Sequence, residues 1–182
     1  MEPWWKEQVV YQIYPRSFQD SNGDGYGDIP GIISRLDEIK ALGAGVIWLS
    51  PVYQSPDADN GYDISDYRAI NPKFGTMADM ERLFAEAKKR GLKIIMDLVV
   101  NHTSDEHEWA RGARAGEPEY DDFFYIFPDR EQPDAYERTL REIFPDEHPG
   151  AFSQLPDGRW VWTTFHSYQW DLNYSNPAVF SA

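Results

Sequence analysis

The stretch Lys93-Ile-Ile-Met-Asp-Leu-Val-Val-Asn-His102 combines an apolar run with three polar side chains, those of Asp97, Asn101 and His102. A strand that is buried on both faces of a parallel sheet is apolar throughout. In a barrel of such strands, the side chains at the carboxyl ends carry the chemistry. Departures from the apolar pattern tend to mark functional positions, so these three residues are candidate site residues. A satisfied buried Asp and a capping Asn-His pair are the structural alternative.

Strands and helices alternate before this run. In chain order, the sequence predicts strand 9–14, a helix between Asp28 and Gly43, strand 46–49, a loop over 52–75, a helix between Thr76 and Gly91, and strand 93–100. Side-chain oxygens of Asp28 and Thr76 are expected to cap the helices, and the glycines to end them. The predicted apolar face of the second helix consists of Met80, Leu83, Phe84 and Ala87.

This alternation predicts an α/β fold with a parallel sheet, either doubly wound or closed into a barrel. It stops after the third strand, and residues 103 to about 173 are expected to form an irregular inserted subdomain with a β-hairpin around Pro156-Asp-Gly158. Three strands and two helices neither close a barrel nor cover both faces of a sheet. We therefore expect exposed apolar surface and interpret the chain as the front part of a longer protein.

The composition limits the partners. Among 182 residues, 31 are acidic and 17 basic, for a net charge of −14, which argues against nucleic acid or an anionic membrane as partner. The chain has no cysteine, which is compatible with the cytoplasm, and no run approaches the length of a membrane span. The aromatic content of 15% suits a sugar-binding cleft, but large rings also fill cores.

Two loops carry further candidate residues. The first alternates oxygen-bearing groups around a turn at Gly25, which predicts a calcium site; its ligands would be Asp20, Asn22, Asp24, the carbonyl of Tyr26, and Asp28. A solvated acidic loop is the alternative. In the second loop, Asp59 precedes Tyr62 by three residues after the second strand, where both would face the same side as His102 in a barrel. From spacing alone, an acidic turn anchored by Tyr62 is favoured there.

Taken in order, several motifs resemble glycoside hydrolase family 13, the α-amylase superfamily. They are Gln12-Ile-Tyr-Pro-Arg-Ser-Phe18, the 20–28 loop, Trp48-Leu-Ser-Pro51, Asn60-Gly-Tyr-Asp63, Asp97-Leu-Val-Val-Asn-His102 and Gln169-Trp-Asp-Leu-Asn173. Residues 1–108 are most similar to the oligo-1,6-glucosidase and α-glucosidase branch, which carries a calcium site in its first loop. Residues from about 120 onward are more similar to amylosucrase and sucrose hydrolase.

This resemblance implies a partial (β/α)8 TIM barrel. Residues 1–102 would be the first part of the barrel, 103–173 the inserted domain B, and 174–182 the start of the return to the barrel. Asp59, Tyr62 and His102 would bind the glucosyl unit, with Tyr62 as the stacking platform and His102 bonded to a sugar hydroxyl. The remaining implied roles are support of the site by Asp97 and Asn101, and contact with the acceptor by Arg141, Phe144 and Phe165.

The family's mechanism retains configuration and uses two carboxylates about 5 to 5.5 Å apart. By the resemblance, the nucleophile, the acid/base and a third stabilising Asp come from later strands, beyond Ala182. No catalytic residue is therefore assigned in this chain, and the isolated chain is expected to be inactive.

The expected substrates are small α-glucosides such as sucrose, isomaltose or maltooligosaccharides. Hydrolysis and glucosyl transfer both stay open, because they differ in how well water is excluded from a shared glucosyl subsite. The alternative is a non-catalytic sugar-binding or interaction protein built on a half barrel.

Overall fold

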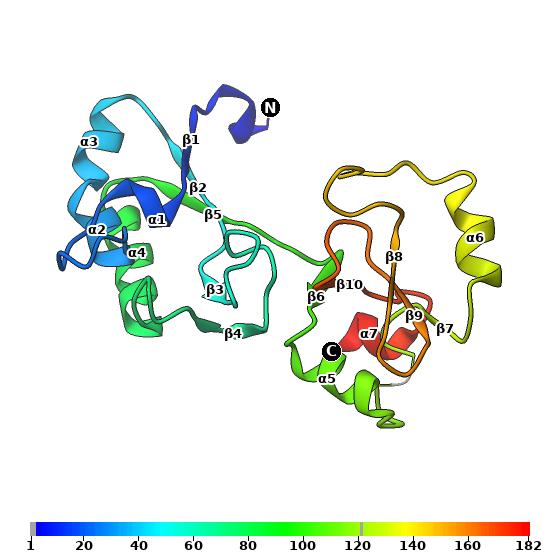
Figure 1. Cartoon of the computed structure of the whole chain (residues 1–182). Helices are drawn as coiled ribbons and strands as arrows, with labels where there is room; N and C mark the ends of the chain where they lie inside the picture. Colours follow the sequence, from blue (N-terminus) through cyan, green and yellow to red (C-terminus); the bar gives the residue numbers. More distant parts are fainter. Residues whose placement is uncertain (1–2, 121) are drawn as a thin grey trace. The chain divides into compact units, whose positions relative to one another are not determined.

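The computed structural model describes residues 3–120 and 122–182 (Figure 1). The chain divides into two compact units, which are described separately: residues up to 54 together with 67–98, and residues 55–66 together with 99–182. Within the described ranges, no helix has the length and apolar character needed to cross a membrane. The predicted domain boundaries at 102 and 173 stay a prediction.

The first unit is built around a parallel sheet. Its elements are η1 (Trp4–Glu7), β1 (Val10–Ile13), α1 (Pro15–Phe18), α2 (Ile29–Ser34), α3 (Leu36–Ala41), β2 (Val46–Leu49), β3 (Tyr53–Gln54), β4 (Asp66–Ile70), α4 (Met77–Lys89) and β5 (Lys93–Met96). The sheet has the order β1-β2-β5, and each pair is parallel. The predicted parallel α/β arrangement is therefore confirmed, as an unclosed sheet.

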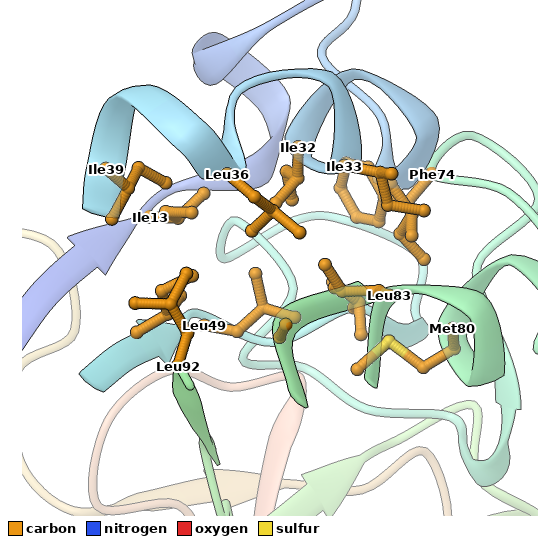
Figure 2. Close-up of a cluster of buried hydrophobic side chains, with 14 of the residues drawn as sticks. Ile13, Ile32, Ile33, Leu36, Ile39, Leu49, Phe74, Met80, Leu83 and Leu92 are labelled. Atoms are coloured by element: carbon orange, nitrogen blue, oxygen red, sulfur yellow. The ribbon is translucent and has the colours of Figure 1, made fainter. Parts of the chain in front are cut away.

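Helices cover one face of this sheet. Figure 2 shows side chains of α2 and α3 meeting Ile13 and Leu49 of the sheet and Leu83 of α4, all of them buried. The opposite face carries Trp48, which is 36% exposed, and Ile95, which is 47% exposed and lies beside it in register. The predicted exposure of apolar surface is confirmed, and Trp48 of the predicted strand 46–49 contributes to it.

Capping signals in the sequence mark the helix starts correctly. The carboxylate of Asp28 accepts a hydrogen bond from the backbone N–H of Gly31 at 2.6 Å and caps α2. Thr76 and Asp79 form a reciprocal capping box at the start of α4. The helix predicted to run unbroken to Gly43 is instead interrupted at Arg35, whose ψ of 3° leaves the helical region and separates α2 from α3.

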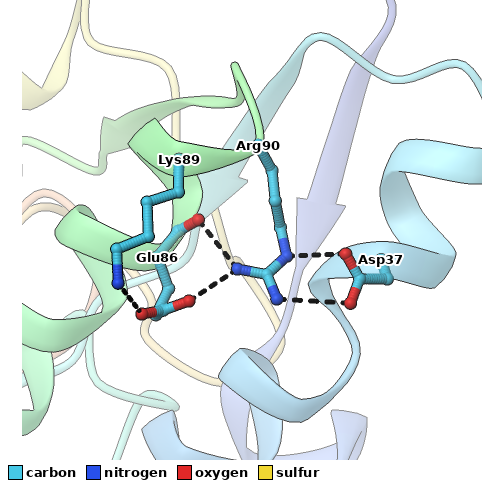
Figure 3. A network of polar contacts seen from close by, with 4 residues as sticks. All are labelled: Asp37, Glu86, Lys89 and Arg90. Atoms are coloured by element: carbon cyan, nitrogen blue, oxygen red, sulfur yellow. Dashed lines mark hydrogen bonds and ion pairs between the residues drawn. The ribbon is translucent and has the colours of Figure 1, made fainter.

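An ion-pair network on the surface joins α3 to α4 (Figure 3). The guanidinium of Arg90 donates to both carboxylate oxygens of Asp37, at 2.7 and 3.2 Å, and to Glu86 at 2.7 Å. Lys89 also donates to Glu86, and the two cations lower the pKa of that carboxyl to about 2. A planar donor held by two carboxylates fixes the relative position of the two helix ends.

Three expectations about this unit need correction. The third strand ends at Met96, so Asp97 follows the strand instead of lying inside it. The region predicted as a loop over 52–75 contains the paired strands β3 and β4. Phe84 is 43% exposed because it lies at the edge of the apolar stripe of α4, whose buried members are Met80, Leu83 and Ala87.

The second unit contains more regular structure than predicted for 103–173. Its elements are β6 (His102–Ser104), α5 (Glu108–Ala115), β7 (Ile126–Phe127), α6 (Glu131–Glu137), β8 (Phe152–Gln154), β9 (Trp160–Trp162), β10 (Gln169–Asp171) and α7 (Pro177–Ser181), with Ala182 as the C-cap of α7. The hairpin is confirmed, because β8 and β9 pair antiparallel across a turn in which Gly158 has a φ of +93°. Trp170 of β10 packs edge to face against Phe124 in the core of this unit.

Candidate functional site

A buried carboxylate shapes the loop that carries Asp59 and Tyr62. The side chain of Asp63, which is 1% exposed, accepts hydrogen bonds from the backbone N–H groups of Ala58 and Asp59 at 2.9 and 3.0 Å. The backbone N–H of Tyr62 donates to the carbonyl of Asp59, which closes a tight turn. Asn60 accommodates this turn with a φ of +51°. The loop therefore holds Asp59 and Tyr62 in one local arrangement, and both side chains are partly exposed.

His102 joins this loop to the start of β6. Its Nε2 lies 3.0 Å from the carbonyl oxygen of Tyr62, and its Nδ1 lies 3.3 Å from the amide nitrogen of Asn101. Burial lowers the pKa of His102, so the imidazole is neutral at neutral pH. Since an amide nitrogen can only donate, Nδ1 is assigned as the acceptor and Nε2 as the N–H that donates to Tyr62.

Aromatic rings continue from His102 across the second unit. The ring of Phe165 lies 5.3 Å from that of His102, and Phe144 lies 6.5 Å from Phe165. His166 stacks between Phe144 and Tyr168 at 4.8 and 5.1 Å, nearly parallel to both. Phe165 thus lies between His102 and Phe144, and the acceptor-side role of Phe144 and Phe165 stays a prediction.

Strand β10 contacts both the strand that begins at His102 and the loop that carries Asp59. It pairs antiparallel with β6, with Gln169 opposite Ser104 and Asp171 opposite His102. The side-chain amide of Gln169 donates to Asp59 Oδ2 at 2.9 Å. Asp171 is buried and accepts hydrogen bonds from the backbone and side chain of Thr164, and burial raises the pKa of its carboxyl.

Gln169 and Asp171 were not predicted as site residues. The signal that indicates them is their alternation around Trp170 in a short strand, since successive side chains point to opposite faces. Trp170 belongs to the core, so its two polar neighbours point to the other face.

The remaining candidates lie as follows. Asp97 belongs to the first unit, where its carboxylate accepts from the indole N–H of Trp48 at 3.2 Å and its carbonyl from the hydroxyl of Tyr53 at 3.3 Å. Asn101 lies beside His102 in the second unit. Arg141 is exposed on the segment between α6 and β8, three residues before Phe144. The binding and supporting roles of these residues stay predictions, as does the placement of the catalytic carboxylates beyond Ala182.

The predicted calcium loop is held by its own hydrogen bonds. The carboxylate of Asp20 accepts from the backbone N–H groups of Asn22, Gly23 and Gly25, and these bonds lower the pKa of Asp20. Asp28 is occupied in capping α2. The oxygen-rich donor set suits a hard cation, but nowhere in the described ranges do three His, Cys, Asp or Glu side chains gather as a metal site. Calcium therefore stays a prediction.

The chemistry of the second unit suits a polyhydroxylated ring. Asp59 offers carboxylate oxygens that accept hydrogen bonds from hydroxyl groups, and it is partly exposed. The ring of Phe165 offers an apolar face beside His102, and Tyr62, whose backbone carbonyl bonds to His102, carries a second aromatic ring on the same loop as Asp59. Flat aromatic faces next to a few convergent polar groups are what a small-molecule site needs for shape and orientation.

Comparison with protein families and curated proteins gives matches over nearly the whole chain. Residues 12–182 match the family described as "Alpha amylase, catalytic domain". Oligo-1,6-glucosidase from Heyndrickxia coagulans is 60% identical over 181 residues, which are 98% of this chain and 32% of that protein. Palatinase from Erwinia rhapontici is 50% identical and is matched over 97% of this chain and 32% of its own length. The chain thus spans about a third of the length of the curated relatives it matches.

Solved structures agree with these matches. A mutant of the trehalulose synthase MutB in complex with the substrate sucrose superposes with a TM-score of 0.90 at 42% identity, over 100% of this chain and 32% of that chain. Trehalose-6-phosphate hydrolase from Bacillus licheniformis superposes with a TM-score of 0.88 at 48% identity, over 99% of this chain and 32% of that one. The fold of this chain is therefore that of the corresponding third of these proteins.

Proposed function

Because this chain belongs to the alpha-amylase family, through its catalytic domain, we propose that the protein containing it is an enzyme that acts on small α-glucosides. The names of its relatives support this substrate class: oligo-1,6-glucosidase, palatinase, and a trehalulose synthase bound to sucrose. Isomaltose, sucrose and maltooligosaccharides are the proposed substrates. The reaction is hydrolysis or transfer of the glucosyl unit, with retention of configuration.

The observation that carries this proposal is the cluster of Asp59, Tyr62 and His102. The hydrogen bond between His102 and the Tyr62 carbonyl, together with the turn from Asp59 to Tyr62, holds the backbone of the loop that carries Asp59 and Tyr62 against the imidazole. In the proposed site, Asp59 accepts hydrogen bonds from glucosyl hydroxyls and Tyr62 stacks on the sugar ring. His102 Nε2 is already bonded to Tyr62, so contact of this nitrogen with a sugar hydroxyl requires that the N–H be shared.

The resemblance to the family implies that substrate binding and catalysis are carried out by different parts of the enzyme. The residues of this chain bind and orient the glucosyl unit, and the carboxylates that attack and protonate are supplied by later strands of the barrel, beyond Ala182. The isolated 182-residue chain is proposed to be inactive for this reason. The alternative is a non-catalytic sugar-binding protein, for which even the protein from the complete reading frame would show no turnover.

The proposed function is tested with the protein encoded by the complete reading frame. Cleavage of isomaltose, sucrose or maltose, measured as release of glucose or fructose, is expected from that protein and not from residues 1–182 alone. Binding of glucose without turnover of any of these sugars would favour the non-catalytic alternative. Turnover by the isolated chain would contradict the assignment of the catalytic carboxylates to later strands.

We further propose calcium as a structural ligand of the 20–28 loop, held by Asp20, Asn22, Asp24, the Tyr26 carbonyl and Asp28. A ligand that binds only the folded state raises the melting temperature with concentration. Calcium is therefore expected to raise the melting temperature of the wild type, and the Asp24→Ala variant is expected to lose this response. Equal melting temperatures with calcium and with a chelator would contradict the proposal.

A further inference from the structure

We propose that Gln169 is a positioning residue for the carboxylate of Asp59, an inference that rests on the proposed function and assigns it a new component. Gln169 lies 110 residues from Asp59 in the sequence, yet its amide nitrogen donates to Asp59 Oδ2 at 2.9 Å. Asp59 lies on a loop and is partly exposed, whereas Gln169 lies in strand β10 and is 1% exposed. The bond thus ties a loop carboxylate to the interior of the second unit.

The backbone of β10 fixes the direction of the Gln169 side chain. Gln169 pairs with Ser104 of β6, and its neighbour Trp170 is 1% exposed in the core. Because side chains alternate along a strand, anchoring Trp170 in the core forces Gln169 toward the opposite face, where Asp59 lies. A side chain held by packing and pairing presents its amide with little conformational freedom, as a positioning residue must.

The orientation of the amide follows from the chemistry of its partner. An ionised carboxylate only accepts hydrogen bonds, so the nitrogen of Gln169 must face Asp59. The amide oxygen, Oε1, then points the other way. It is the one buried side-chain nitrogen or oxygen atom without a hydrogen-bond partner in the part of the chain that the structure describes.

An unsatisfied buried acceptor lowers stability, and each such group in a folded protein calls for an explanation. Packing alone does not explain a glutamine here, since an apolar side chain of similar volume would leave no acceptor unpaired. An apolar residue at position 169 would lack the N–H that Gln169 donates to Asp59 Oδ2. This bond engages Oδ2 and holds the carboxylate plane, leaving its other acceptor positions for a glucosyl hydroxyl.

The same face of β10 also serves His102. Asp171 lies two residues after Gln169 and interacts with Asn101, whose amide donates to His102 Nδ1. The two polar residues of β10 therefore lie behind Asp59 and His102, two of the predicted sugar-contacting residues. Strand β10 therefore helps to orient both the Asp59 carboxylate and the His102 ring.

The test compares Gln169→Leu and Gln169→Glu in the protein encoded by the complete reading frame, with Gln154→Leu as matched control. Gln154 is exposed on β8 of the same unit. The Leu variant loses the donor but also the unpaired acceptor, so it is expected to fold with an unchanged or higher melting temperature. Its kcat/KM on isomaltose is expected to fall about tenfold or more, while the control stays near the wild type.

The Glu variant supplies a readout that a merely structural role would not move. It places a second carboxylate against Asp59, whose charge, like that of Asp63, already acts on both His102 and Tyr168. Two carboxylates in contact retain a shared proton at low pH, and the protonated partner donates as the amide did. We therefore expect the activity of Gln169→Glu relative to the wild type to recover as the pH falls.

Three outcomes separate the claims. Wild-type kcat/KM in Gln169→Leu, or a relative activity of Gln169→Glu that does not depend on pH, would overturn the role of Gln169. If Gln169→Leu fails to fold, the pH profile of Gln169→Glu still decides. If the wild type turns over no α-glucoside, the proposed function fails and this inference falls with it.

Discussion

At the scale of single residues, His102 shows how burial and hydrogen bonding select one chemical form of a side chain. Its ring nitrogens lie against a donor, the amide of Asn101, and an acceptor, the carbonyl of Tyr62. Only the neutral ring satisfies both, and burial lowers its pKa in the same direction. The histidine at the end of the apolar run thus holds the loop of Tyr62 in place, whether or not it also contacts a sugar.

Replacement of His102 by Leu is expected to destabilise the protein by about 1–3 kcal/mol, because the Tyr62 carbonyl loses its donor. His102→Gln retains an N–H that can donate to that carbonyl, so it is the matched control and is expected to cost less. Urea unfolding of the two variants and the wild type measures the difference. Equal free energies of unfolding for His102→Leu and the wild type would show that this hydrogen bond does not stabilise the loop.

His107 predicts a pH dependence of stability. Its Nδ1 accepts from the backbone N–H of Trp109 at the start of α5, and burial lowers its pKa. Protonation removes this acceptor and places a positive charge at the helix N-terminus, where it is unfavourable. Since the folded pKa lies below the unfolded value of about 6.5, this contribution is present above pH 6.5 and is lost as the pH falls toward the folded pKa.

The variant His107→Asn keeps a capping side chain that does not titrate, so its stability is expected to fall less than that of the wild type between about pH 7 and 5. His102 contributes a slope of the same sign to both proteins, so the comparison isolates His107. Chemical unfolding at several pH values gives the two slopes. Parallel curves would refute the capping role.

At the scale of elements, local chemistry predicted the starts of helices well and the ends of strands less well. The caps at Asp28 and Thr76 lie where the sequence indicated, because a capping bond spans only three residues. The strand from Lys93 was predicted too long, because an apolar run continues past Met96 although the pairing partner β2 ends at Leu49. The interruption between α2 and α3 at Arg35 was not predicted, because neither Gly nor Pro occupies that position.

Helix α4 allows a sharp test of which side chains hold the first unit together. Leu83 is buried in the core, whereas its neighbour Phe84 is largely exposed. Leu83→Ala is expected to cost about 2–5 kcal/mol and Phe84→Ala less than about 1 kcal/mol. Denaturant unfolding measures both. A larger loss for Phe84→Ala would mean that the apolar face of α4 extends further round the helix than the structure indicates.

At the scale of the whole molecule, the sequence predicted the family and the parallel sheet but only part of the candidate site. Motifs such as Asn60-Gly-Tyr-Asp63 and the run ending at His102 are contiguous, so they are visible in one dimension. The bond from Gln169 to Asp59 joins residues 110 positions apart and depends on the register of β10 with β6. Strand pairing of that kind cannot be read from the local sequence pattern, and the bond between Gln169 and Asp59 was missed for this reason.

The proposed function requires that these residues belong to an enzyme that cleaves α-glucosides with retention of configuration. Proton NMR of the anomeric signals during the first minutes of hydrolysis of p-nitrophenyl α-glucoside, whose only glucose is the glucosyl unit, by the protein from the complete reading frame tests this requirement. We predict that α-glucose appears first and that the β-anomer follows only by mutarotation. Initial release of β-glucose would contradict the retaining mechanism, and consumption of none of isomaltose, sucrose and maltose would contradict the proposed function itself.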